Sequence, residues 1–403
     1  MPSPSCLKLR QLFFTTTISQ TEDLLMTQSS LLDKGPALFI AQPFSPKRKG
    51  WETLEACCKT AGGAGYRGGI QLPLWDSRLI DLDQAAESTT YCEELKGKAA
   101  EAGCPITSVA NHLNTNLVVV SPAYRAQLSL FAPKELHFAS IDQLHNWADA
   151  QVRKTVLATR NLGFDCCAAF SGGTLFPYIY KWPAQPNGLV DNAMRHLANR
   201  WMPHFDFALE NGVRWAFEEH PGMDLLCGGA MRQFLEKHGK NHAACCKNLD
   251  LSHRELMGIT EDGMAEEMEQ DADRIIMWHI KDAALIPTSA WGVYCFMPWI
   301  QCPGQFRSLG DGRINYPRFF KIAREKKINV IPVVEWECSV KGIDQGITEE
   351  GAPYVECCLS GTDLPGQTAA RAHSDVFDAF AEGASGARLI AEMLGIPEAD
   401  VVL

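Results

Sequence analysis

The stretch Trp215-Ala216-Phe217-Glu218-Glu219-His220-Pro221-Gly222 decides how this chain folds. An apolar run reaches two carboxylates and an imidazole, and then stops at Pro-Gly. This pattern is typical of a buried parallel strand whose C-terminal end carries polar, functional side chains. The sequence therefore predicts a parallel sheet with a site at the end of this strand.

Three later stretches repeat the same pattern, so that four runs in order end in acidic or imidazole side chains. They are residues 243–253, which end in Asp250 and His253, residues 275–282, which contain His279, Lys281 and Asp282, and residues 330–338, which contain Glu335 and Glu337. One such run is common by chance. Four successive runs indicate that their polar ends share a ligand.

The whole chain alternates apolar strand-like runs with helical periodicity. We expect strands at residues 37–41, 66–73, 106–113, 164–170, 215–220, 243–250, 275–282 and 328–335. We expect helices near residues 51–61, 82–102, 140–162, 189–210, 260–272 and 317–326. Such alternation demands parallel strands joined by helical crossovers, which is an α/β fold.

Two α/β architectures fit eight strand-helix units, a closed (β/α)8 TIM barrel and an open doubly wound sheet. The barrel explains functional groups at the ends of four successive strands, whereas an open sheet would gather them at one switch point. We therefore predict a TIM barrel over residues 36–385. A long insertion, residues 284–314, follows the seventh strand.

The two ends of the chain differ from this barrel. Residues 1–35 read as a disordered N-terminal tail, and residues 386–403 as a C-terminal helical tail. Closing helices are expected around residues 369–380 and 387–394. The N-terminal tail contains a weak organelle-targeting pattern in residues 1–25, which is the alternative to a cytoplasmic location.

Composition excludes several kinds of partner. The 403 residues carry a formal net charge of −11, which argues against nucleic acid as a ligand. No apolar run reaches the ~18 residues that a membrane span requires. The 15 cysteines include four adjacent pairs and no CxxC pair, so we interpret most of them as reduced core residues in the cytoplasm.

The alternation of strand side chains predicts which polar groups meet. Residues two apart share a face, so Glu218, Asp250, His279 and Glu335 can all point into the mouth of the barrel. Three carboxylates gathered there would repel one another unless a cation neutralised them. Three oxygen donors and one imidazole suit Mn²⁺, Mg²⁺, Co²⁺ or Zn²⁺. For each residue alone, a salt-bridged or capping side chain is the alternative.

The ordered motifs resemble the xylose-isomerase-like TIM-barrel superfamily, from about residue 37 to residue 380. The motifs are E-x-H-P at 218–221, D-x-S-H at 250–253, H-x-K-D at 279–282 and E-x-E at 335–337. Segments 170–172, 177–183 and 304–312 resemble bacterial-type proteins called sugar phosphate isomerase/epimerase. The motif set is specific for the superfamily and not for a substrate.

This resemblance implies a metal-dependent isomerase or epimerase that removes a proton next to a carbonyl and forms a metal-bound enediolate. Its metal ligands would be Glu218, Asp250, His279 and Glu335, and the two glutamates would also exchange the proton. His253 matches a histidine that binds substrate oxygens. The ketose 3-epimerases of the family carry an arginine where this chain has Leu285, and Arg307 in the insertion is a candidate replacement.

Further residues are candidates for contacts with a carbohydrate or keto-sugar. His220 and Lys281 could supply a proton or orient a hydroxyl, although His220 could serve structure alone and Lys281 could simply pair with Asp282. Glu337 is expected at the rim. His112 and Trp182 complete the expected substrate contacts, with core packing and loop packing as their respective alternatives.

Other functions remain compatible with the same residues. Dehydration or lyase chemistry on a keto-sugar or keto-inositol, including 3-keto-glycoside cleavage, would use the same site. A DNA-repair endonuclease of the same superfamily is disfavoured by the acidic charge, and a non-catalytic sugar-binding barrel by the complete set of ligand types. The sequence leaves open the sugar, its phosphorylation, the metal and whether the chain forms a homo-oligomer.

Overall fold

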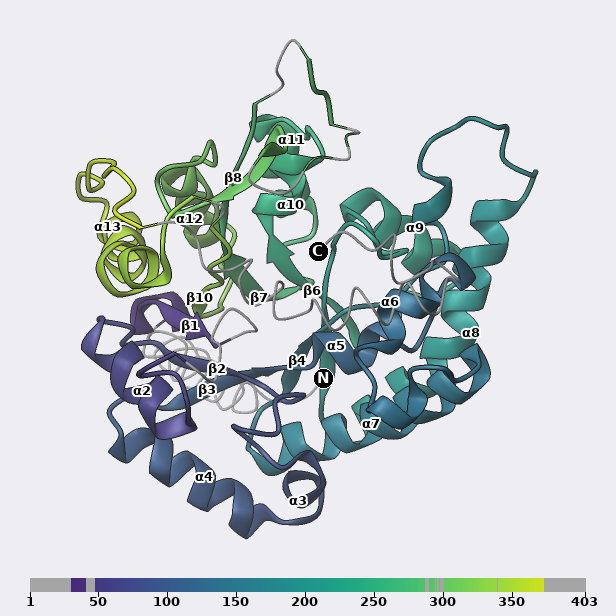
Figure 1. Ribbon diagram of the computed structural model, residues 1–403, viewed down its shortest axis with the longest axis horizontal. Coiled ribbons are helices and arrows are strands. Elements are labelled where there is room, and N and C mark those ends of the chain that lie inside the picture. The colour runs from purple at the N-terminus through teal and green to yellow at the C-terminus, as the bar shows by residue number, and fades with distance from the viewer. Residues whose placement is uncertain are drawn as a thin grey trace, which may run out of the picture.

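A closed barrel of eight parallel strands forms the centre of the protein (Figure 1). The computed structural model describes residues 30–40, 48–286, 290–293, 295, 297, 301–338 and 340–372. The strands follow one another around the barrel in the order β1-β10-β7-β6-β5-β4-β3-β2. Their bounds are β1 Ala37–Phe39, β2 Gly69–Pro73, β3 Ile106–Ala110, β4 Cys166–Ala169, β5 Arg214–Glu218, β6 Cys245–Asp250, β7 Ile275–Ile280 and β10 Pro332–Val334. The predicted TIM barrel is confirmed.

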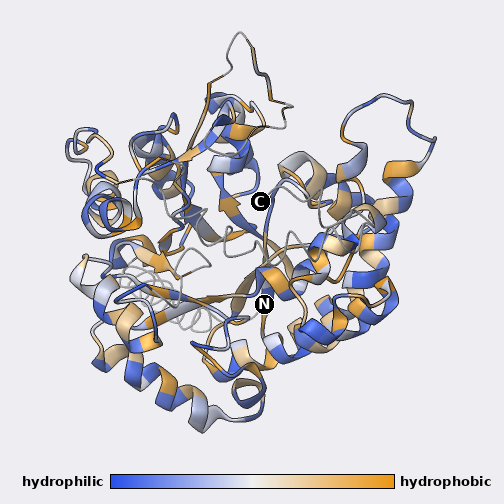
Figure 2. Cartoon of the chain, viewed as in Figure 1, coloured by the Kyte–Doolittle hydropathy of each residue, from blue (hydrophilic) through white to orange (hydrophobic). Residues whose placement is uncertain are grey.

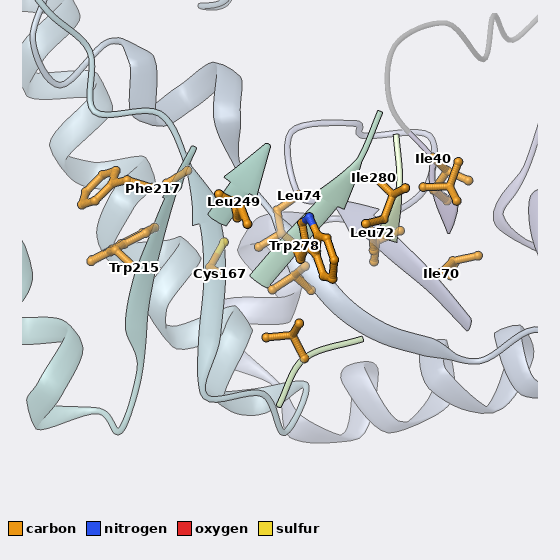
Figure 3. Close-up of a cluster of buried hydrophobic side chains, with 14 of the residues drawn as sticks. Ile40, Ile70, Leu72, Leu74, Cys167, Trp215, Phe217, Leu249, Trp278 and Ile280 are labelled. Atoms are coloured by element: carbon orange, nitrogen blue, oxygen red, sulfur yellow. The ribbon is translucent and has the colours of Figure 1, made fainter. Parts of the chain in front are cut away.

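The strands pack on two sides with different side chains. Large apolar groups such as Trp215, Phe217 and Trp278 face outward to the helices (Figure 3). The barrel interior holds mainly small residues, which are Ala37, Ala110, Ala168 and Ala216, together with Phe39, Met277 and Val333. Burial on both faces explains why the strands read as nearly continuous apolar runs.

Helices surround the barrel and turn their apolar sides toward it (Figure 2). The larger ones are α2 Leu54–Gly63, α4 Thr89–Glu101, α7 Ile141–Asn161, α8 Leu189–Glu210, α9 Gly228–Lys237, α11 Glu261–Gln270, α12 Tyr316–Glu325 and α13 Ala352–Ser360. The shorter ones are α3 Leu82–Glu87, α5 His112–Asn116, α6 Arg125–Ser129 and α10 Leu251–Leu256, and the 3₁₀ turns are η2 Leu31–Lys34, η3 Pro122–Tyr124, η4 Lys134–Leu136 and η5 Phe176–Tyr178.

Several helices differ from the expectation, among them α13, where the sequence predicted no helix. The single helix expected at residues 82–102 is divided into α3 and α4, because extended Ser88 ends α3 and caps α4 with its side chain. Helix α9, between β5 and β6, was not expected, and it starts at two glycines that weaken its helical pattern.

The insertion after β7 begins as an antiparallel hairpin. Strand β8 Asp282–Leu285 pairs with β9 Gly304–Arg307. The Asp282 carboxylate accepts hydrogen bonds from the backbone N–H groups of Gly310, Gly312 and Ile314, at 2.9, 3.0 and 3.3 Å. This side chain therefore fixes the return of the insertion to the barrel.

The π-helix η7 Asp344–Gly351 packs against the end of the last barrel strand. A Cβ atom on Gly346 would lie 2.0 Å from Trp336 Nε1, so the close approach requires glycine. Trp336 Nε1 also donates to Ser308 Oγ at 3.2 Å, in the insertion. Trp336 lies between Glu335 and Glu337, and its packing therefore holds both glutamates in place.

Both expected tails lie mostly outside the described residues. Residues 30–35 of the expected N-terminal tail contain the short helix η2. Residues 361–372 contain no helix, and the remainder of the helices expected at 369–380 and 387–394 falls beyond the described range. Among the described residues every cysteine is a free thiol, and no helix is long and apolar enough to cross a bilayer.

Two glycine substitutions should have opposite effects on stability. Gly346→Ala should lower the free energy of unfolding by ~1–3 kcal/mol, because the added methyl group overlaps Trp336. Gly97→Ala, inside α4, meets nothing within 4 Å and should raise it by ~0.5–1 kcal/mol. Urea unfolding of both variants measures the difference, and equal midpoints would refute the packing described for Trp336.

Candidate metal centre

Four acidic or imidazole side chains meet inside the barrel at the C-terminal ends of β5, β6, β7 and β10. They are Glu218, Asp250, His279 and Glu335, and one ligand atom of each lies within 4.8 Å of all the others. All four are buried, with exposed fractions from 0 to 8%. The inward direction expected from strand alternation is therefore observed for the whole set.

His279 lies between two of the carboxylates. Its Nδ1 is 3.0 Å from an oxygen of Glu218 and 3.0 Å from an oxygen of Glu335. Its Nε2 lies 2.8 Å from the Gln71 side-chain oxygen on β2. Burial lowers the pKa of His279, but the charges of Glu335 and Glu218 outweigh it and raise the pKa to about 10.

Lys281 is the second cation of the site and directly follows strand β7. Its Nζ is 3.0 Å from Asp250, 2.9 Å from Glu335 and 3.1 Å from Glu337. Although burial opposes the charged form, these carboxylates raise the pKa of Lys281 well above its ordinary value. The alternative of a pair between Lys281 and Asp282 is wrong, because the described contacts of Lys281 Nζ go to other acids.

Glu218 receives the largest number of polar contacts in the cluster. His253 Nε2 lies 3.1 Å from one of its oxygens, and His112 Nε2 lies 3.2 Å from the other. Asn248 Nδ2 donates to it at 3.2 Å. Burial raises the pKa of Glu218, but His279, His112 and His253 outweigh it and hold the pKa well below the usual range. Glu218 is therefore ionised at neutral pH, which is the form that binds a cation.

Glu335 and Glu337 differ in electrostatic environment although Lys281 contacts both. Burial raises the pKa of Glu335, but Lys281 and His279 lower it to about 2. The pKa of Glu337 is raised, by burial first and then by the neighbouring charge of Glu335. Glu335 is thus the better carboxylate ligand of the two.

Aromatic and imidazole rings form a continuous collar around the cluster. Adjacent ring centroids are 4.1–5.9 Å apart along the sequence Trp75, Phe39, His112, Phe170, His220, His253 and Phe306. Lys281 Nζ lies 4.9 Å from the centroid of the Phe306 ring. Burial, with the charges of His253 and Lys281, lowers the pKa of His220 to about 3, so this ring is neutral.

The structure does not place two of the expected substrate contacts in this collar. Trp182 is 79% exposed, on the loop before α8. Arg307 pairs across the hairpin with Asp282, and no described contact joins it to the four acidic and imidazole groups. Its neighbour Phe306 faces the site instead, because successive residues of a strand point to opposite sides.

Gln71, Asn248 and Phe306 are among the residues around the cluster that were not singled out from sequence as functional. Gln71 and Asn248 interrupt apolar strand runs with buried amides, which is the signal that could have revealed them. Phe306 carries no comparable signal, because its direction depends on the register of the hairpin.

The donor set fits a divalent cation. Three carboxylates and one imidazole nitrogen suit Mn²⁺, Mg²⁺, Co²⁺ or Zn²⁺, and Gln71 would fix the orientation of His279 from behind. Asp250 Oδ2 lies 3.0 Å from Lys281 Nζ and 3.3 Å from His253 Nε2, while the Ser252 N–H donates to the other oxygen at 2.8 Å. An ion at this point would compete with Lys281 for Asp250 and Glu335.

Comparisons with known proteins agree with this architecture. Residues 59–356 match the family model described as "Xylose isomerase-like TIM barrel". A protein of that description from Mycobacterium smegmatis, crystallised with magnesium, is 16% identical with a TM-score of 0.55, covering 83% of this chain and 99% of its own. 3-Keto-D-glucoside 4-epimerase from E. coli is 13% identical with a TM-score of 0.51, covering 81% and 98%. At these identities, the structural likeness establishes the fold alone. No curated protein gives a significant match.

We expect metal binding to depend on pH. With its pKa near 10, His279 is protonated at neutral pH and must release that proton before Nδ1 can bind a cation. The apparent affinity should therefore rise by up to about tenfold per pH unit between pH 6 and 8, with release of about one proton. Calorimetry with Mn²⁺ in buffers of different ionisation enthalpy measures both quantities.

Two variants control this experiment. His279→Ala and Asp250→Asn should each weaken binding at every pH, and His279→Ala should also remove most of the pH dependence. Unchanged affinity in both variants would place the metal elsewhere. An affinity for the unmodified chain that does not change with pH would contradict the protonated state of His279.

Proposed function

Because the chain belongs to the xylose isomerase-like TIM barrel family, we propose that it is a divalent-metal-dependent isomerase or epimerase of sugars. The observation that carries the proposal is the buried group of Glu218, Asp250, His279 and Glu335 at the barrel mouth. A divalent ion bound there supplies positive charge that stabilises an enediolate. The rest of the chemistry falls to the protein's own side chains.

Two of these carboxylates are suited to move the proton next to a carbonyl. Glu218 and Glu335 approach His279 Nδ1 from β5 and β10, which lie on either side of β7 in the barrel. Each has a pKa lowered below the usual range, so both are ionised at neutral pH. One can accept the proton from one face of a substrate, and the other can return a proton to the opposite face after it has taken one up from water.

His253 and Lys281 would handle the substrate oxygens. Their nitrogens lie 3.3 Å apart, and both contact the carboxylate cluster. An ammonium group next to a developing enediolate oxygen stabilises it electrostatically. The aromatic collar, with Phe39 and Phe306 among its members, would exclude water and pack on the C–H faces of a sugar ring.

Solvent exchange tests this proposal most directly. The metal-loaded protein should catalyse deuterium incorporation from D₂O at one carbon next to the carbonyl of its substrate, in a panel of free ketoses and keto-glycosides followed by NMR. A product that has lost water or a glycosyl group would assign elimination instead. A protein that binds the metal but exchanges no proton across the panel would refute the proposal.

A matched pair of glutamine variants tests which glutamate transfers the proton. Glu335→Gln keeps an oxygen ligand and nearly the same volume but removes basicity, so exchange should fall ~10²–10⁴-fold while much of the metal is retained. Glu337→Gln should have the milder effect, because Glu337 lies nearer the rim of the site. The reverse ranking of the two exchange rates would assign the base to Glu337.

A further inference from the structure

A second charged cluster lies behind the metal ligands, on the helix-facing side of β5 and β6. Its members are Glu219, Lys247, Arg254, Glu267 and Asp271, each no more than 7% exposed. Glu219 follows Glu218, and Arg254 follows His253, so consecutive residues serve opposite faces of the barrel wall. Nothing in the proposed chemistry uses this rear cluster.

The rear cluster is paired throughout. Lys247 Nζ lies 3.1 Å from Glu219, 2.9 Å from Glu267 and 2.7 Å from Asp271. Arg254 Nη2 contacts Glu219 and, at 2.7 Å, Glu267. Burial raises the pKa of Glu267, but the positive charges of Arg254 and Lys247 outweigh this effect and lower the pKa to about 2.

Arg254 differs from Lys247 because it also binds the backbone. Its Nη1 donates to the carbonyl oxygen of Glu219 at 2.8 Å and makes a longer contact of 3.4 Å to that of Asp250. The last recorded pair of the β5–β6 ladder joins Glu218 to Asn248. Arg254 thus bridges the ends of β5 and β6 just beyond the last pair of the ladder. It contacts the backbone of Glu219, which follows the proposed ligand Glu218, and the backbone of the proposed ligand Asp250 itself.

Stability alone gives a poor account of this arrangement. Buried ion pairs often contribute little net stability, because removing the charges from water costs about as much as their attraction returns. A guanidinium group, however, holds several acceptors in a fixed plane, which an ammonium group cannot do. Gly228, at the start of α9, also leaves room for Glu267, since a Cβ there would lie 2.6 Å from its carboxyl carbon.

We propose that Arg254 is a positioning residue that sets the spacing of Glu218 and Asp250 for the metal ion. It does so by joining the carbonyl groups at the ends of β5 and β6 through Nη1, while Glu219 and Glu267 hold Nη2. The same group fixes the start of α10 and so keeps His253 against Glu218, 3.1 Å away. This inference rests on the proposed metal-dependent function.

Replacement by lysine tests the proposal while preserving the charge. Arg254→Lys should weaken Mn²⁺ binding by ~10–100-fold in calorimetry, the range found for residues that support metal ligands. The rise in Tm on adding Mn²⁺ should shrink accordingly. Arg232→Lys is the matched control, because Arg232 contacts Asp271 at 2.7 Å on the rim of the same cluster and is 44% exposed. It should bind Mn²⁺ like the unmodified chain.

A second variant covers the case in which Arg254→Lys does not fold. Glu219→Gln keeps the backbone carbonyl but removes one charged anchor of Arg254, and it should weaken Mn²⁺ binding several-fold relative to the control. A folded variant whose Tm falls by the same amount with and without Mn²⁺, and whose affinity for Mn²⁺ equals that of the unmodified chain, would show that Arg254 serves stability only. That result would refute the proposal. Failure of the unmodified chain to bind any divalent ion would instead refute the proposed function.

Discussion

The concentration of carboxylates at one end of the barrel is the constraint on which the rest of the site depends. Glu218, Asp250, Glu335 and Glu337 point into the same buried space, where unpaired charges are unfavourable. Strand β7 and the residue after it supply the compensation, because β7 lies between β6 and β10 in the barrel and both His279 and Lys281 contact the carboxylates. The order of strands around the barrel thus places each cation between acids.

The same constraint operates on the opposite face of β5 and β6. These strands carry charges inward and outward at the same level, with Glu218 and Glu219 as neighbours in the chain. An apolar layer against the helices would suffice for packing, as it does at Phe217 and Leu249. The buried charges that replace it at Lys247 and Arg254 tie together strand ends and helix starts that hydrophobic contacts alone would leave free to shift.

Much of this arrangement can be predicted from sequence because it follows from short-range rules. Strand alternation and the polar ends of four apolar runs are sufficient to gather Glu218, Asp250, His279 and Glu335. Strand β7 is the one place where strict alternation along the whole strand does not hold. Ile275 packs toward the helices and Met277 packs inside the barrel, and the register with β6 shifts between them. Strict alternation starting from Ile275 would predict that His279 points outward, because a bulge adds a residue that the local sequence pattern does not reveal.

Long-range register explains the remaining differences between expectation and structure. The charge of Arg307 made it the natural candidate to reach the substrate, but the β8–β9 pairing sets Asp282 opposite Arg307 and Ala283 opposite Phe306. Phe306 consequently lies over Lys281, with its ring face toward the ammonium group. An aromatic ring at this point leaves Lys281 bound to Asp250, Glu335 and Glu337 and adds no competing positive charge. The hairpin therefore contributes an apolar wall and a weak cation–π contact, and the charge balance of the site is left to β7.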